Sequence, residues 1–206
     1  MDAFMSYFRE YWYLFVILVI LLGVMLFMFR KAGLALQKTK EEKEKLIKKL
    51  DHMKLIRETY SDLDKEKILE DDGENLLEGV ADNIQVRLEK AEDMNNAFEE
   101  LNEEEKLVYA FHYFLDEAAE VPSAFFKQFT KPLTPYTNEA CKKFLSKETA
   151  VLVTKMYDAY DEDNETASVI ASEISSLDDE IAEKLDVVSA KAKACQFIKD
   201  NVEKFV

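Results

Sequence analysis

His112 and Asp116 are the residues of this sequence that come closest to a catalytic arrangement. They stand four positions apart in a segment with helical periodicity, so one helical turn would bring the carboxylate beside the imidazole. A carboxylate placed there can orient a histidine for general base catalysis. No serine or cysteine nucleophile accompanies the pair in a known motif, and a surface or boundary histidine explains it more simply. We therefore expect no enzyme.

A run of acidic residues, Asp161, Glu162, Asp163 and Glu165, suggests calcium binding. An EF-hand loop that began at Asp161 would need glycine at its sixth position and glutamate at its twelfth. Thr166 and Ser172 occupy those positions, so the motif fails at both. The two cysteines and two histidines of the chain lack the spacing of a zinc site. The sequence predicts no metal and no cofactor.

Acidic residues dominate the second part of the chain more generally. The net charge is −15 over 206 residues, and the excess acid lies from residue 58 onward, whereas residues 36–57 are net basic. A domain this acidic repels nucleic acid and attracts basic proteins. Carboxylates on rigid helices can also imitate the charge of a nucleic-acid duplex. The predicted partner-binding residues are exposed acids, namely Glu103, Glu104, Asp161, Glu162, Asp163, Asp178, Asp179 and Glu180.

The elements that position these acids are all expected to be helices. Apolar residues recur at intervals of three or four, no period-two alternation is found, and no glycine follows Gly79. The pattern predicts an all-α fold of about seven helices. The first two expected helices cover residues 34–60 and 75–101, and the third begins at the Asn102–Glu105 capping box. A short fourth helix contains Phe125 to Phe129, and a fifth begins at Thr134-Pro135. The last two cover residues 151–160 and the segment from Ile181 to Phe205.

The apolar run at residues 11–29 predicts a single transmembrane helix. Its length as a helix, about 28 Å, matches the hydrocarbon core of a bilayer. Tyr11, Trp12 and Tyr13 would lie at the outer interface and Arg30 and Lys31 at the cytoplasmic one, because basic residues stay in the cytoplasm. A cleaved signal peptide is disfavoured, since the run is long and no basic segment precedes it. We expect a single-pass protein of the inner (plasma) membrane, in contact with lipid, with its N-terminus outside.

This interpretation divides the chain into four parts. They are an external segment at 1–10, the transmembrane helix at 11–29, a basic juxtamembrane stalk helix at 30–60 and an acidic, all-helical cytoplasmic domain at 61–206. Leu46, Leu50 and Met53 have the spacing of a coiled-coil seam. The seam covers fewer than the three or four heptads that a coiled coil needs, so a stalk helix is favoured over a dimeric coil.

The segment from Phe98 to Phe129 resembles a family of small, acidic, helical bacterial domains whose best-known member is a DNA mimic. That family opens with an acidic capped helix and continues through a turn to a Phe-x-Gln-aromatic segment, which Phe126, Gln128 and Phe129 match. The segment from Leu177 to Phe205 resembles its closing helix. Val121 to Phe125 replaces the family's asparagine-glycine turn, and the apolar N-terminal run is an addition. The resemblance implies the helical fold, gives those three residues a structural role and implies no catalytic residue.

These observations predict a membrane-anchored, acidic helical protein-interaction module. In its most specific form, it captures a basic nucleic-acid-binding protein as a DNA mimic and does not bind nucleic acid itself. The alternative is a structural or scaffolding envelope protein that forms homo-oligomers through apolar helix faces. Dependence of binding on salt would favour the first prediction, and concentration-dependent oligomers would favour the second.

Overall fold

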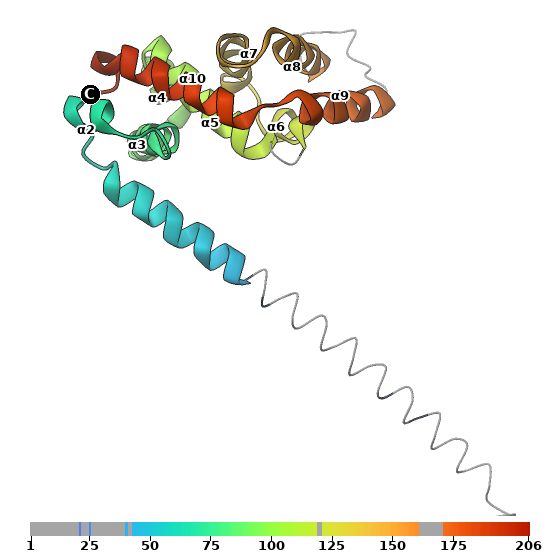
Figure 1. The fold of residues 1–206 in the computed structure, drawn as a ribbon, viewed down its shortest axis with the longest axis horizontal. Helices are drawn as coiled ribbons and strands as arrows, with labels where there is room; N and C mark the ends of the chain where they lie inside the picture. The colour runs from blue at the N-terminus through green and yellow to red at the C-terminus, as the bar shows by residue number, and fades with distance from the viewer. Residues whose placement is uncertain (1–20, 22–24, 26–39, 41–42, 119–120, 161–170) are drawn as a thin grey trace, which may run out of the picture. The chain divides into compact units, whose positions relative to one another are not determined.

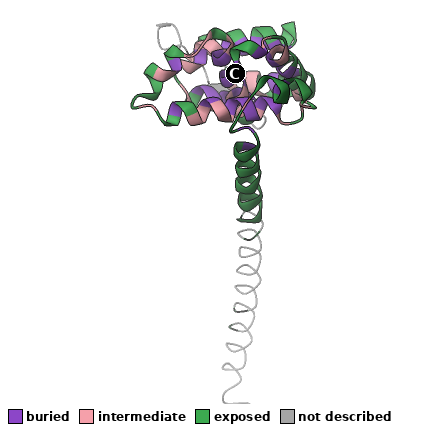
Figure 2. Ribbon diagram, turned by 90° about the vertical axis from the view of Figure 1, so that its left-hand side faces the viewer, coloured by how far each residue is buried: buried purple, intermediate pink, exposed green. Residues whose placement is uncertain are grey.

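The structure is a computed structural model that describes residues 21, 25, 40, 43–118, 121–160 and 171–206. Every regular element in this described part is a helix, which confirms the all-α fold class (Figure 1). The chain forms two compact units, Met1–Met53 and Lys54–Val206. In the second unit, buried residues gather between the helices and exposed residues cover their outer sides (Figure 2).

The second unit contains a succession of short helices joined by tight, polar connections. Helix α5 packs against α3, α6, α7 and α10, so it forms the centre of the unit. Phe111 and Phe114 of α5 are fully buried, and their rings contact Phe144 and Phe125, with centroids 4.8 and 5.7 Å apart. The elements are α2 (Lys65–Glu70), α3 (Leu76–Glu89), α4 (Met94–Glu100), α5 (Glu103–Ala118), α6 (Pro122–Gln128), α7 (Leu133–Phe144), α8 (Lys147–Tyr160), α9 (Ala171–Lys184), α10 (Val187–Asp200) and the 3₁₀ turn η1 (Val202–Lys204).

Side chains cap many of these helices, as expected for a sequence with so few glycines. The predicted capping box is present before α5. The Asn102 side chain accepts from the Glu105 N–H at 2.8 Å, and the Glu105 carboxylate accepts from the Asn102 N–H at 3.1 Å. Asp64, Asp93 and Asp186 cap α2, α4 and α10, and in each case the carboxylate accepts from backbone N–H groups of the first turn. Each cap satisfies backbone N–H groups that a helix start leaves without a partner.

Two of the predicted helices are wrong in length because each contains an interior cap. The expected helix at 75–101 is divided into α3 and α4, and Asp93 starts the second piece. The expected last helix is divided into α9 and α10, and Asp186 starts the second piece. The predicted helix start at Thr134-Pro135 is also displaced, because α7 begins at Leu133. The described residues consequently form more helices than the seven predicted.

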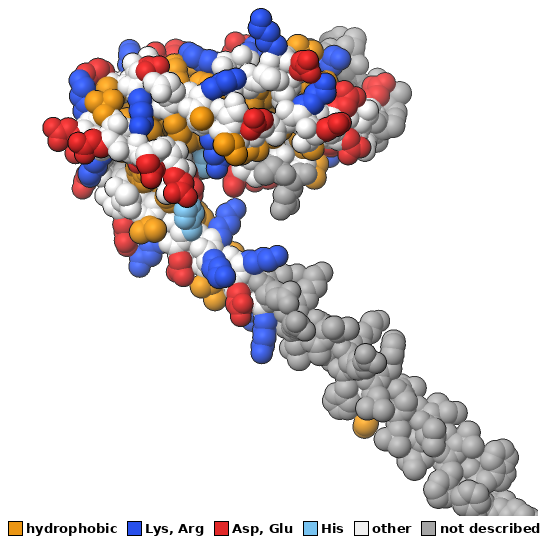
Figure 3. Space-filling model, in the orientation of Figure 1, with side chains coloured by type: hydrophobic (Ala, Val, Ile, Leu, Met, Phe, Trp, Pro, Cys, Tyr) orange, Lys and Arg blue, Asp and Glu red, His pale blue; other side chains and the backbone are white. Residues whose placement is uncertain are grey.

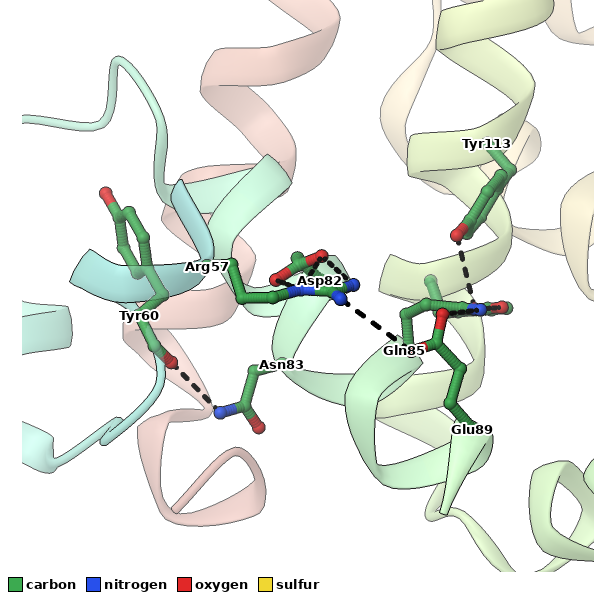
Figure 4. Close-up of polar contacts among 8 residues, drawn as sticks. Arg57, Tyr60, Asp82, Asn83, Gln85, Glu89 and Tyr113 are labelled. Carbon is green, nitrogen blue, oxygen red and sulfur yellow. Dashed lines mark hydrogen bonds and ion pairs between the residues drawn. The ribbon is translucent and has the colours of Figure 1, made fainter. Parts of the chain in front are cut away.

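The last turn of the predicted stalk belongs to the core of the second unit. Ile56 and Tyr60 are buried there, and the Tyr60 ring fills the space where a side chain on Gly79 would lie. The Arg57 guanidinium contacts the Asp82 carboxylate at 3.0 Å, and the Asn83 side-chain amide donates to the Tyr60 carbonyl at 3.0 Å (Figure 4). These contacts fasten residues 54–60 to α3.

The first unit is described over few residues. Residues 43–53 are helical, and their side chains are exposed. Apart from Leu21 and Met25, the predicted transmembrane segment lies outside the described residues, as do the predicted interface residues Tyr11, Trp12, Tyr13, Arg30 and Lys31. None of the helices in the described part is long and apolar enough to cross a membrane. This finding overturns the predicted localisation, a single-pass protein of the inner membrane with its N-terminus outside.

Candidate functional site

Helix α9 carries a row of carboxylates on its outer side. Glu173, Asp179, Glu180 and Glu183 are exposed, and their positions in the sequence place them within one side of a helix. The opposite side carries Ile181, which is buried, and other apolar residues that pack against the core. The exposed residues Glu173, Asp179, Glu180 and Glu183 are called the α9 acidic face below. Acidic side chains are plainly gathered at the end of the second unit where α9 lies (Figure 3).

The α9 acidic face has little compensating positive charge. Within the described residues, no ion pair holds Glu173, Asp179 or Glu183. The single basic residue of α9 is Lys184, and its ammonium contacts Glu148 of α8 at 3.1 Å. The hydrogen bond that the ammonium donates to Glu148 is the main reason that the pKa of Lys184 is raised, and attraction by Glu180 and Glu183 adds to it. Most of the charge of the face is therefore available to a partner.

Asp178, a predicted partner-binding residue next to this face, has a structural role. Its carboxylate accepts hydrogen bonds at 2.7 Å from both the N–H and the hydroxyl of Ser123, which is fully buried. Ser123 lies in the first turn of α6, so Asp178 caps that helix from a position 55 residues later in the chain. The structure thus separates Asp178 from its neighbours Asp179 and Glu180.

Glu103 and Glu104 lie in the first turn of α5, far along the chain from α9. Glu103 is exposed, and its carboxylate is 3.5 Å from the ammonium of the buried residue Lys106. Glu104 is half-buried. Acidic residues in a first turn interact favourably with the helix dipole. Both residues therefore have a structural role at the start of α5, whether or not they also bind a partner.

Three more of the predicted partner-binding residues, Asp161, Glu162 and Asp163, lie outside the described residues. Glu173 and Glu183 of the α9 acidic face were missed. The sequence prediction followed the consecutive acids at 178–180, whereas the helical period links position 173 with 180 and 183. A helical projection of residues 171–184 would have found both residues.

The residues that carry the family resemblance lie in and beside α6. Phe126 is buried against Phe114 and Phe125, and Phe129 is half-buried with its ring 4.9 Å from that of Phe125. Gln128 is exposed at the last position of α6. The two aromatic residues therefore anchor α6 on the core.

His112 is half-buried on α5, beside the ring of Tyr113. Burial is the largest influence on it and lowers the pKa of the imidazole, and Glu78 and Asp116 oppose this effect by attraction. Among the described residues, no group of three or more histidine, cysteine or acidic side chains is arranged to hold a metal ion.

Comparisons with known proteins give no assignment. No protein-family model matches this sequence, and neither a curated protein nor a solved structure is similar enough to count as a match.

Proposed function

We propose that this protein is an interaction module that captures a basic, nucleic-acid-binding protein, with the α9 acidic face in the place of a DNA strand. The observation that carries the proposal is the concentration of exposed carboxylates on one side of α9, which outnumber Lys184, the single base of that helix. Glu173 and Glu183 are ten residues apart, so the face extends over about 15 Å. The four carboxylates are separated by three intervals that average about 5 Å, compared with about 3.4 Å between charges along one strand of duplex DNA.

The arrangement of the face also costs the helix stability. Asp179 and Glu183 are four residues apart, and Glu180 and Glu183 are three apart, so like charges lie next to each other on the helix surface. Each such pair destabilises a helix by a few tenths of a kcal/mol. A protein that needed only solubility could distribute the same acids so that they alternate with bases. Local features that oppose stability are expected at functional sites.

The experiment that tests the proposal is retention of cell proteins on the immobilised full chain at low salt, followed by elution with duplex DNA. We expect basic nucleic-acid-binding proteins to be retained and DNA to release them, because both would occupy the same basic surface. High salt should release the same proteins. Retained proteins that neither DNA nor salt releases would contradict the proposal.

A pair of matched variants makes this test specific. The first, the α9-neutral variant, combines Glu173→Gln, Asp179→Asn, Glu180→Gln and Glu183→Gln. The control variant neutralises four exposed acids elsewhere, with Glu66→Gln, Glu70→Gln, Glu92→Gln and Glu100→Gln. Both lose the same net charge. Retention of basic proteins should disappear for the α9-neutral variant and persist for the control variant. Equal loss of retention in both would show that binding depends only on the total charge of the chain.

A second function, self-association as a scaffold, is favoured by a different observation. Leu46, Ile47, Leu50 and Met53 are each 45–58% exposed, and their spacing places them on one side of the helix at residues 43–59. If this side joins copies of the chain, the apparent mass in solution should rise with concentration. Leu46→Ser with Leu50→Ser should abolish the rise, whereas Leu55→Ser, a change of an exposed residue outside that row, should not.

A further inference from the structure

Three exposed lysines, Lys143, Lys147 and Lys193, lie where the end of α7, the start of α8 and the middle of α10 meet. The Lys193 ammonium donates to the carbonyl of Leu145 at 3.4 Å, and Lys147 follows Leu145 by two residues. The Lys143 ammonium lies over the ring of Phe197, 4.0 Å from its centroid, and Phe197 is one helical turn beyond Lys193. These contacts bring the three charges together, and the three residues are called the lysine cluster below.

The lysine cluster carries more positive charge than its surroundings balance. Within the described part of the chain, no ion pair includes a member of the cluster. Glu139 and Glu148, which lie close to it in the sequence, are paired with other lysines at 2.7 and 3.1 Å. Asp186, which lines the same small hollow as Lys193, caps the start of α10 and offsets one charge at most. In a chain with a net charge of −15, such a cluster favours an acidic partner.

The lysine cluster lies beside the end of the α9 acidic face. Lys184, the last residue of α9, lines the same hollow as Lys193, and Glu180 and Glu183 attract its ammonium. Lys184 follows Glu180 by four residues, so it lies on the same side of the helix as the face. A basic patch and an acidic patch are thus neighbours. A second copy, related by a two-fold rotation, presents the same two patches in the opposite order, so each patch can meet its complement.

We propose that the second unit forms a two-fold dimer in which the α9 acidic face of each copy contacts the lysine cluster of the other. The overall negative charge of the two chains opposes the dimer only weakly at physiological salt, because charges more than about 8 Å apart are screened, whereas facing charges in the contact are closer. The dimer would cover the α9 acidic face, so dimer formation and capture of a basic protein would exclude each other. This consequence rests on the proposed function, whereas the dimer itself does not.

Sedimentation equilibrium of the full chain over a range of concentrations tests the proposal. Every chain carries Leu46→Ser with Leu50→Ser, so that the exposed apolar row does not contribute. The lysine-reversed variant combines Lys143→Glu, Lys147→Glu and Lys193→Glu, and its matched control combines Lys48→Glu, Lys90→Glu and Lys204→Glu at exposed positions outside the cluster. We expect the parent chain and the control to form dimers, and the dissociation constant of the lysine-reversed dimer to be at least tenfold higher. A monomeric parent chain, a mass that rises beyond two copies, or equal weakening in both variants would overturn the proposal.

A mixture of two variants identifies the contacting patches. The acid-reversed variant combines Asp179→Lys, Glu180→Lys and Glu183→Lys, and alone it should not dimerise, because both of its patches are basic. Mixed with the lysine-reversed variant, it should form a one-to-one dimer, because each patch again faces its complement. Only folded chains can restore the dimer in this way. Failure of the mixture to dimerise would overturn the proposal and would leave the capture of basic proteins, which the α9-neutral variant tests, unaffected.

Discussion

The start of α5 and the middle of α9 each contain three consecutive acids, and the structure uses the two runs differently. At Glu103 to Glu105, bases are close by, since Arg87 contacts Glu105 and the ammonium of Lys106 lies near Glu103 and Glu99. At Asp178 to Glu180, Asp178 caps α6, and the remaining two acids face outward with Glu173 and Glu183. The comparison shows that a run of acids in the sequence contains both structural and available charges. Neighbouring bases balance the charge of the acids at the start of α5, and they balance that of the α9 acidic face much less. This difference distinguishes a structural run of acids from a candidate binding face.

The largest effect is expected at Glu105, the buried acid of the α5 run. Glu105→Ala would remove the acceptor of the Asn102 N–H and the partner of Arg87. We expect a loss of about 3 kcal/mol in the free energy of unfolding, because a cap and a charge-assisted bond are lost together. Urea unfolding measures this loss, and Glu105→Gln, which keeps an acceptor, should cost less. A loss below about 1 kcal/mol would mean that the α5 run is not structural.

The next effect is expected at Asp178, the inward acid of the α9 run. Asp178→Ala would leave the buried N–H and hydroxyl of Ser123 without their acceptor. The expected cost is about 2 kcal/mol, less than at Glu105 because Asp178 is only half-buried and water can enter. The same unfolding measurement on Asp179→Ala is the control and should show a change below about 0.5 kcal/mol. Similar costs at both positions would remove the distinction between inward and outward acids.

A smaller effect is expected at the first turn of α5. Glu103→Gln with Glu104→Gln removes favourable interactions with the helix dipole and the contact between Glu103 and Lys106. We expect a loss of about 0.5–1 kcal/mol at low salt, and most of it should vanish in 1 M salt because the charges are screened. Thermal unfolding at the two salt concentrations measures the difference. A loss that does not depend on salt would show that packing, not charge, is responsible.

The smallest effect on stability, with the opposite sign, is expected for the α9-neutral variant. Its substitutions remove like-charge neighbours on the helix surface, so the free energy of unfolding should rise by up to about 0.5 kcal/mol. Urea unfolding beside the control variant measures the change. A clear loss of stability would show that the α9 acidic face holds the fold together, and would contradict its assignment as a binding face.

Local sequence signals predicted part of this architecture well. The Asn102–Glu105 capping box involves residues three positions apart, so its pattern is visible without any tertiary structure. The breaks before Asp93 and Asp186 were missed, because the apolar period continues across them and neither glycine nor proline marks them. An aspartate inside an apolar period resembles an exposed helical residue until its backbone angles are known.

The features that the sequence did not predict depend on contacts between segments that are distant in the chain. Asp178 finds Ser123 across 55 residues, and no local pattern indicates that pairing. The contact between the rings of Phe126 and Tyr160 likewise depends on how α6 and α8 pack, although both aromatic residues are evident in the sequence. The α9 acidic face was predictable from the sequence in part. Its acids could be found by helical projection, but only the structure shows that Lys184, the base of α9, also contacts Glu148.

A competition titration tests the central claim most directly. A basic protein retained by the chain is first bound to a labelled DNA duplex, and full-length chain is then added while release of the duplex is followed by fluorescence anisotropy. We predict that the wild-type chain and the control variant displace the duplex, and that the α9-neutral variant needs at least tenfold more protein to do so. Displacement by all three at the same concentration, or a complex of chain, partner and DNA together, would contradict the claim that the α9 acidic face takes the place of DNA.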